Sequence, residues 1–235
     1  MTKKISPVAN ARAIVAGVTA PELVAHLRLL RNPVNVAGQR RFGITPKTEH
    51  LGISIAVLRP LARPLRKDHP LALKLWASEI HEARLLAALV EDPAKVDRTQ
   101  ATRWARDFDS WDICDQVCGE VLPYVPFALE QAKQWTTQRA EFVKRAGFVL
   151  VARMAVRRKD LADDLFLEFL PTVRREATDD RNFVRKAVNW ALRQIGKRSP
   201  HLRRAAIAEA KAIAKIDSRA ARWIAADALR ELTGK

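Results

Sequence analysis

The segment Glu141-Phe142-Val143-Lys144-Arg145-Ala146 decides the fold, because a near copy, Asn182-Phe183-Val184-Arg185-Lys186-Ala187, follows it 41 residues later. A second pair of matching segments, Ala191-Leu192-Arg193 and Ala228-Leu229-Arg230, is related by a shift of 37 residues. Apolar residues recur at helical spacing around both pairs, and no stretch alternates with a period of two. The sequence therefore predicts a repeated unit of about 40 residues that contains two helices.

Such a repeat is typical of HEAT-type α-solenoids, in which each helical pair buries its apolar face against its neighbours. We expect an all-α, HEAT-like solenoid with a concave basic face. A single domain is predicted over 1–235, with N-terminal helices and a loop in 1–50 and the repeats in 51–235. A loop is expected over 32–51. Helices are expected at 11–18, 21–30, 53–67, 70–90, 97–107, 111–121, 126–134, 138–157, 161–176, 181–197, 202–214 and 218–232.

Charge is the strongest clue in the composition. The chain has 42 Lys and Arg against 26 Asp and Glu, and residues 135–235 hold 23 of these cations and 12 of the acids. A basic excess of this kind suits a phosphate backbone, although an anionic membrane surface or ribosomal RNA would also account for it. No apolar run is long enough to span a membrane, and the start lacks the apolar stretch of a signal peptide. We therefore expect a cytoplasmic protein.

Two cysteines, Cys114 and Cys118, lie four residues apart on one expected helix, and no histidine lies close to them in sequence. A zinc site needs more ligands nearby, so these residues are expected to be reduced thiols. No phosphate-binding glycine motif is present, and His81-Glu82 lacks the second histidine of a metalloprotease helix. We predict no metal and no small-molecule cofactor.

An aromatic residue and an acid share one face of the helix expected at 111–121. Trp111 and Asp115 are four residues apart, which places them about 40° apart around a helix. Ile113, Val117 and Val121 repeat on the opposite side and are the expected buried face. On a basic protein, a carboxylate beside an aromatic ring indicates a site for a cation on an anionic polymer. The alternative is that Trp111 packs under a neighbouring helix and that Asp115 is merely solvated.

A second tryptophan lies off the core in the helix expected at 181–197. Trp190 is roughly opposite an apolar stripe made of Val184, Val188, Ala191, Leu192 and Ile195. Three cations fall near it, namely Lys186, Arg193 and Lys197. One repeat earlier, Arg145 is also predicted to lie off the apolar stripe. Trp190 could instead pack against an adjacent repeat and the cations could form a solvated face, but their combination favours a nucleic-acid surface.

The chemistry that this set favours is cleavage of a glycosidic bond. A single carboxylate can stabilise a developing sugar cation and orient a water molecule. The arrangement suits a leaving base that is already positively charged, because such a base needs no general acid and is attracted to an aromatic face.

The residues resemble the AlkD-like DNA alkylation repair glycosylases, a family of HEAT-like solenoids, over roughly 52–232. The resemblance rests on Leu75-Trp76, His81-Glu82-Ala83-Arg84, Ser110-Trp111-Asp112-Ile113-Cys114-Asp115, Lys144-Arg145-Ala146-Gly147 and Phe183-Val184-Arg185-Lys186-Ala187-Val188-Asn189-Trp190-Ala191-Leu192-Arg193. The resemblance implies that Asp115 is the catalytic acid, that Trp111 and Trp190 form the aromatic wall, and that Arg145 contacts the DNA backbone. Some members add a tyrosine from an N-terminal helix, whereas the corresponding region, 39–42, ends in Phe42 and has no tyrosine.

The sequence thus predicts a monomeric DNA glycosylase of base excision repair. It would hydrolyse the N-glycosidic bond of cationic N3- or N7-alkylated purines in duplex DNA. Lys186, Arg193 and Lys197, together with Arg145, would hold phosphates. The alternatives are a non-catalytic protein that binds particular DNA structures with the same surface, and a protein-binding scaffold.

Overall fold

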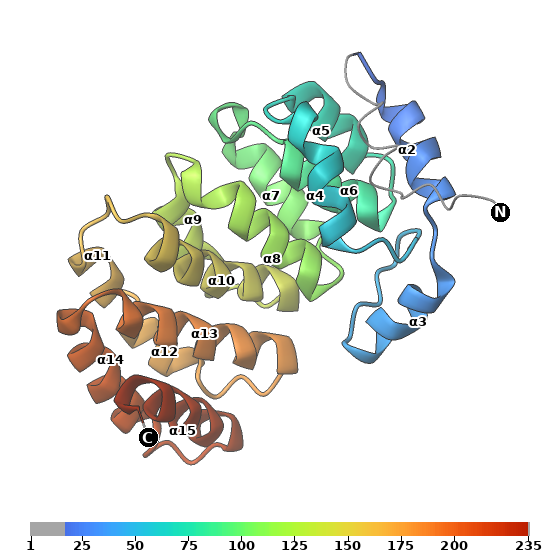
Figure 1. Ribbon diagram of the computed structural model, residues 1–235. Helices are drawn as coiled ribbons and strands as arrows, with labels where there is room; N and C mark the ends of the chain where they lie inside the picture. Colours follow the sequence, from blue (N-terminus) through green and yellow to red (C-terminus); the bar gives the residue numbers. More distant parts are fainter. Residues whose placement is uncertain (1–16, 235) are drawn as a thin grey trace. The chain divides into compact units, whose positions relative to one another are not determined.

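A computed structural model describes residues 17–234, and these are almost entirely helical (Figure 1). The one extended pairing among them is an isolated bridge between Glu49 and Ile80. The all-α prediction is therefore confirmed. The helix predicted at 11–18 lies outside the described residues except for its last two positions. Within 17–234, no helix is both long and apolar enough to cross a membrane.

The described residues pack as two compact units, and the first comprises 17–97 and 109–121. Its central helix is α6 (His81–Val90), in which every residue is buried and which contacts α4, α5 and α8. A helix that is buried on all sides must be covered by several neighbours. The other elements of this unit are α2 (Ala20–Leu29), α3 (Pro33–Arg41), α4 (Ile55–Ala62), η1 (Arg63–Leu65), α5 (His69–Trp76), η2 (Pro93–Lys95) and α8 (Trp111–Glu120).

Two features of the first unit correct the sequence predictions. The segment expected to be a loop over 32–51 contains the helix α3. This helix begins at the N-cap residue Asn32 with Pro33 in its first turn, and none of its residues is buried. The helix expected at 70–90 is two helices, because the chain turns through Glu79, whose φ is +54°. Just after this turn the His81 amide donates a hydrogen bond to the backbone carbonyl oxygen of Glu49 at 2.8 Å. The break between the two helices therefore allows a tertiary contact with the segment that precedes α4.

A buried carboxylate fixes the loop that leads into α4. Both oxygens of Glu82 accept backbone N–H bonds, from Leu51 at 2.9 Å, from Gly52 at 2.6 Å and from Ile53 at 3.2 Å. Gly52 has a φ of +78°, and a Cβ there would lie 2.4 Å from the Asn32 carbonyl oxygen. A glycine is therefore required at this close approach of two chain segments.

The second unit comprises 98–108 and 122–234. Helix α13 (Asn182–Arg198) lies between α10 (Glu141–Arg157) and α15 (Arg219–Thr233) and contacts both (Figure 1). All five residues of the apolar stripe predicted for α13 are fully buried, which confirms that part of the face assignment. The other elements are α7 (Arg98–Arg106), η3 (Leu122–Tyr124), α9 (Ala128–Trp135), α11 (Asp164–Leu167), α12 (Leu170–Glu176) and α14 (Pro200–Ile213).

The repeats of the second unit are helical pairs, α9 with α10, α12 with α13 and α14 with α15. The helix predicted at 161–176 is divided into α11 and α12, because Pro171 in the first turn of α12 has no amide to continue an earlier helix. Between α13 and α14, Ser199 caps the new helix through the Leu202 amide and Pro200 follows it. The single domain over 1–235 remains a prediction.

Candidate nucleic-acid interface

In the first unit, Trp111 opens α8 on the side away from the core. The predicted buried residues Ile113, Val117 and Val121 are each at most 1% exposed, which confirms that face. The indole of Trp111 is half-buried, and its Nε1 donates to the Phe42 carbonyl oxygen at 2.9 Å. The Phe42 ring itself is 74% exposed. The ring of Trp111 is therefore oriented by the segment that follows α3.

The first turn of α8 is attached to α6 by a buried histidine–carboxylate pair. His81 Nε2 lies 2.8 Å from Asp112 Oδ2, and Ser110 Oγ donates to Asp112 Oδ1 at 2.5 Å. Burial acts to raise the pKa of Asp112, but the hydrogen bond and charge of His81 outweigh it and hold the pKa below its ordinary value. Burial acts to lower the pKa of His81, yet Asp112 raises it. The contact between the two side chains fixes the start of α8 against α6.

Asp115 stands one turn after Trp111 on α8 and is half-buried. The aromatic ring and the carboxylate that the sequence singled out thus come from one helix whose first turn is attached to α6. Both residues are half-buried, whereas Ile113, Val117 and Val121 on the same helix are buried. Their roles remain predictions.

In the second unit, Arg145 is buried rather than off the core, which corrects the predicted exposure. It is 6% exposed, and its Nη1 donates to the Phe183 carbonyl oxygen at 2.7 Å. The reason is that α10 contacts α7, α9 and α13, so its residues from 145 to 152 are buried on every side. Arg145 therefore joins α10 to the first turn of α13.

Trp190 on α13 is half-buried, and an arginine that the sequence reasoning missed lies over its ring. The Arg153 guanidinium is 4.9 Å from the ring centroid. With its amide oxygen turned toward them, Gln194 accepts from Trp190 Nε1 at 3.1 Å and from Lys197 Nζ at 3.0 Å. Arg153 precedes Trp190 by 37 residues, which equals one of the repeat shifts in the sequence. A search for cations one repeat before each off-core tryptophan would have found it.

Two of the cations predicted to hold phosphates are paired with acids of α15. Arg193 donates to Glu231 and lies 3.6 Å from Asp227, and Lys197 also donates to Glu231. Burial acts to raise the pKa of Glu231, but Lys197 and Arg193 lower it below its ordinary value. Lys186, by contrast, is exposed and has no ion pair among residues 17–234. Positive charge on α13 is therefore neutralised toward its C-terminal end.

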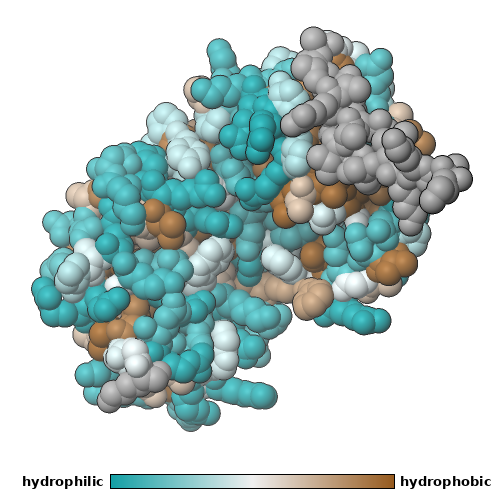
Figure 2. Space-filling view, viewed as in Figure 1, coloured by the Kyte–Doolittle hydropathy of each residue, from teal (hydrophilic) through white to brown (hydrophobic). Residues whose placement is uncertain are grey.

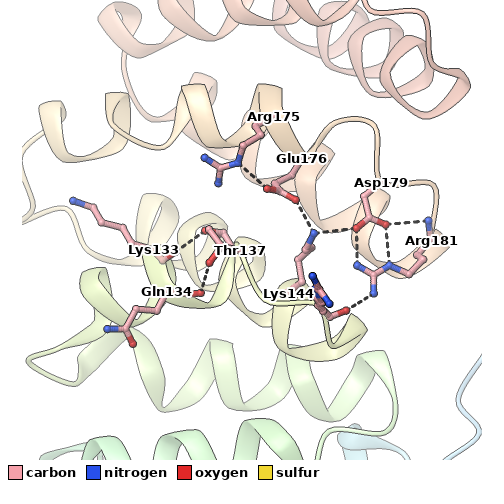
Figure 3. Close-up of polar contacts among 10 residues, drawn as sticks. Lys133, Gln134, Thr137, Lys144, Arg175, Glu176, Asp179 and Arg181 are labelled. Carbon is pink, nitrogen blue, oxygen red and sulfur yellow. Dashed lines mark hydrogen bonds and ion pairs between the residues drawn. The ribbon is translucent and has the colours of Figure 1, made fainter.

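Other cations of the second unit form ion pairs in a cluster near the N-terminal ends of α10 and α13 (Figure 3). Lys144 Nζ lies 2.6 Å from Glu176 and 3.3 Å from Asp179, and Arg181 pairs with Asp179 at 2.6 Å. Burial acts to raise the pKa of Asp179, but Arg181 and Lys144 hold it below its ordinary value. The face of the molecule drawn in Figure 2 is largely hydrophilic.

Among the described residues, no group of three or more His, Cys, Asp or Glu is arranged to hold a metal ion. Cys114 and Cys118 are both buried and form no disulfide.

The helical pairs and their stacking define a HEAT-like repeat protein. A solved structure with the same fold has a TM-score of 0.77 and 19% identity, and the match covers 92% of this chain and 97% of that one. That protein is described as belonging to a new family related to the HEAT-like repeat DNA glycosylases, with affinity for branched DNA structures.

Residues 23–232 match the sequence model of the DNA alkylation repair enzyme family, and this chain belongs to that family. The uncharacterized protein Lin0241 of Listeria innocua is 24% identical over 202 residues, which are 85% of this chain and 88% of that protein. The uncharacterized protein Lmo0209 of Listeria monocytogenes is similar to the same extent.

Proposed function

We propose that this protein is a DNA glycosylase that hydrolyses the N-glycosidic bond of cationic N3- or N7-alkylated purines in duplex DNA, as a step of base excision repair. The observation that carries the proposal is the Trp111–Asp115 pair on the non-core side of α8, whose first turn is fixed by the His81–Asp112 contact of 2.8 Å. Membership of the DNA alkylation repair enzyme family supports it. A pre-oriented carboxylate beside an aromatic ring is suited to a positive charge that develops during a reaction.

In the proposed reaction the bond between C1′ and the purine nitrogen breaks, and its electron pair stays with the base, which leaves neutral. Asp115 stabilises the sugar cation and orients a water molecule. The water oxygen adds to C1′, and its proton passes to Asp115 and then to solvent. Trp111 and Trp190 contact the lesion nucleotide, and their ring faces attract the cationic base before the bond breaks.

The structure suggests unequal roles for the proposed phosphate contacts. Lys186 is exposed and available. Arg193 and Lys197 would each have to exchange Glu231 for a phosphate. Arg145, at 6% exposure, would act chiefly by holding α10 against α13. We further propose that the protein acts as a monomer in the cytoplasm, associated with DNA.

The deciding experiment is the Asp115→Asn substitution, which removes the charge and keeps the size of the side chain. Single-turnover release of N7-methylguanine and N3-methyladenine should fall by about 10²-fold or more, while DNA affinity is retained. Glu120→Gln is the matched control, because Glu120 is a carboxylate at the end of the same helix and pairs with Arg59 at 3.4 Å. Equal release by the wild type and Asp115→Asn would remove Asp115 from the mechanism.

A second candidate function is non-catalytic binding of branched DNA. It is favoured by the match to 97% of a protein described as having that affinity, and by the absence of a tyrosine at 39–42. This candidate predicts that the wild type binds three- and four-way DNA junctions more tightly than linear duplex. It also predicts no release of alkylated bases above the uncatalysed rate.

A further inference from the structure

A second arginine–tryptophan stack lies at the N-terminal ends of α13 and α15. The Arg185 guanidinium is 4.7 Å from the ring centroid of Trp223, and that ring is 37% exposed. The only polar contact of the guanidinium among the described residues is a long one, from Nη2 to Asn182 Oδ1 at 3.5 Å. Its Nε is buried and has no hydrogen-bond partner there. Nothing in the proposed glycosylase reaction uses this pair.

Helices α13 and α15 run parallel, and this stack is the first of three side-chain contacts spaced one turn apart between them. Three residues of α13 contact the residue 38 positions later on α15: Arg185 meets Trp223, Asn189 meets Asp227 and Arg193 meets Glu231. In the second and third contacts the α15 residue is a carboxylate: Asn189 donates a hydrogen bond to Asp227, and Glu231 forms an ion pair with Arg193. In the first contact the α15 residue is the aromatic ring of Trp223, and no carboxylate among residues 17–234 forms an ion pair with Arg185.

A tryptophan face holds a guanidinium by cation–π attraction and leaves its N–H edges available, and a planar fork of N–H donors matches a phosphate. Lys186 follows directly, is exposed, and also has no ion pair among the described residues. It lies one turn before Trp190 on nearly the same face of α13, about 6 Å along the helix axis. Lys186 therefore stands beside Trp190, whereas Arg185 lies about 100° further around α13 and faces Trp223.

We propose that Arg185 and Lys186, with Trp223 as the platform that orients Arg185, bind backbone phosphates of the DNA strand next to the nucleotide that contacts Trp190. The inference rests on the proposed function, because it assumes that DNA is the ligand. Carboxylates of an acidic protein segment would be the other chemistry that fits the two cations. Phosphate is favoured because the same unit already pairs its remaining α13 cations with carboxylates and leaves these two without one.

The test is the salt dependence of DNA binding by the double variant Arg185→Gln/Lys186→Gln. Each lost phosphate contact should lower the slope of log affinity against log salt concentration by about 0.9, so the double variant should lose about 1.8. The control is Arg174→Gln/Arg175→Gln, which removes two adjacent arginines of the same unit that already pair with Glu209 and Glu176. The control should keep a slope close to that of the wild type.

Two single variants separate charge from geometry and from folding. Lys186→Gln changes an exposed side chain, so it should fold normally and lose about 0.9 of the slope. Arg185→Lys keeps the charge and loses the planar fork, so it should weaken binding and retain the slope.

The outcomes for the two proposals differ. A wild-type protein whose DNA affinity does not change with salt would overturn the proposed function itself. A steep wild-type slope that is unchanged in a folded Lys186→Gln and in the double variant would overturn only the phosphate-binding role of Arg185 and Lys186.

Discussion

Replacing Arg145 by alanine tests whether the structure or the helical pattern describes this residue correctly. The substitution removes the hydrogen bond from Nη1 to the Phe183 carbonyl oxygen, which is 2.7 Å long, and the buried stem that leads to it. A hydrogen bond from a charged group contributes about 1.5–3 kcal/mol. The two methylenes beyond Cβ contribute about 0.8 kcal/mol each. The free energy of unfolding should therefore fall by about 3–5 kcal/mol.

The measurement is thermal unfolding followed by circular dichroism. For a chain of this length, each kcal/mol lowers Tm by about 2–4 °C, so a decrease of about 6–20 °C is expected. Arg145→Lys keeps the charge and most of the stem and should lose about half as much. Lys186→Ala is the exposed control and should stay within about ±0.5 kcal/mol of the wild type. DNA affinity should be measured well below the Tm of the variant, so that only folded protein is compared.

The sequence pattern alone predicts the opposite result, a normal Tm together with weaker DNA binding. If Arg145→Ala melts within about 1 °C of the wild type, the burial argument is refuted. Arg145 would then be an accessible cation, as its position off the apolar stripe predicts.

Two further predictions concern the first unit. Gly52→Ala should destabilise the protein by about 2 kcal/mol or more in denaturant titration, because φ is +78° and the new Cβ would lie 2.4 Å from the Asn32 carbonyl oxygen. Gly38→Ala, in open space on α3, should instead stabilise it by up to about 1 kcal/mol. His81 has a raised pKa, so its contribution to stability is present below about pH 6.5 and is lost as the pH rises through that raised value. His50 has a pKa lowered chiefly by burial, so stability is lost as the pH falls below about 6.5. His81→Gln should flatten the alkaline side of the stability–pH profile and His50→Gln the acid side; equal profiles for both variants would contradict the assignment.

Local patterns succeeded where one helix meets one partner face. The stripe of Ile113, Val117 and Val121 in α8 is buried as predicted, because apolar spacing at the helical period reports a single packed side. Apolar periodicity did not predict helix α3, because none of its residues is buried. Asn32 followed by Pro33 is a typical helix start, so a prediction based on capping residues rather than on periodicity would have found this helix.

The residues of the candidate site also differ in how far the sequence could predict them. Its aromatic and acidic residues were recognisable from their types and spacing, whereas the partners of its cations were not. Arg153 over Trp190 and Glu231 beside Arg193 join residues 37 and 38 positions apart. A count of charges along the chain treats all of these as available, although ion pairing removes several of them.

The sequence by itself determined the helical class, the repeat, the family resemblance and the residue types that can carry the chemistry, because these depend on local periodicity and on motifs within single helices. The tertiary structure decided which of those residues are buried and which cations keep their charge. Arg145 is buried because α10 is covered on several sides, and Lys186 is exposed without an ion pair among residues 17–234. Burial and neutralisation depend on neighbours brought together by packing, and the period of one helix carries no record of them.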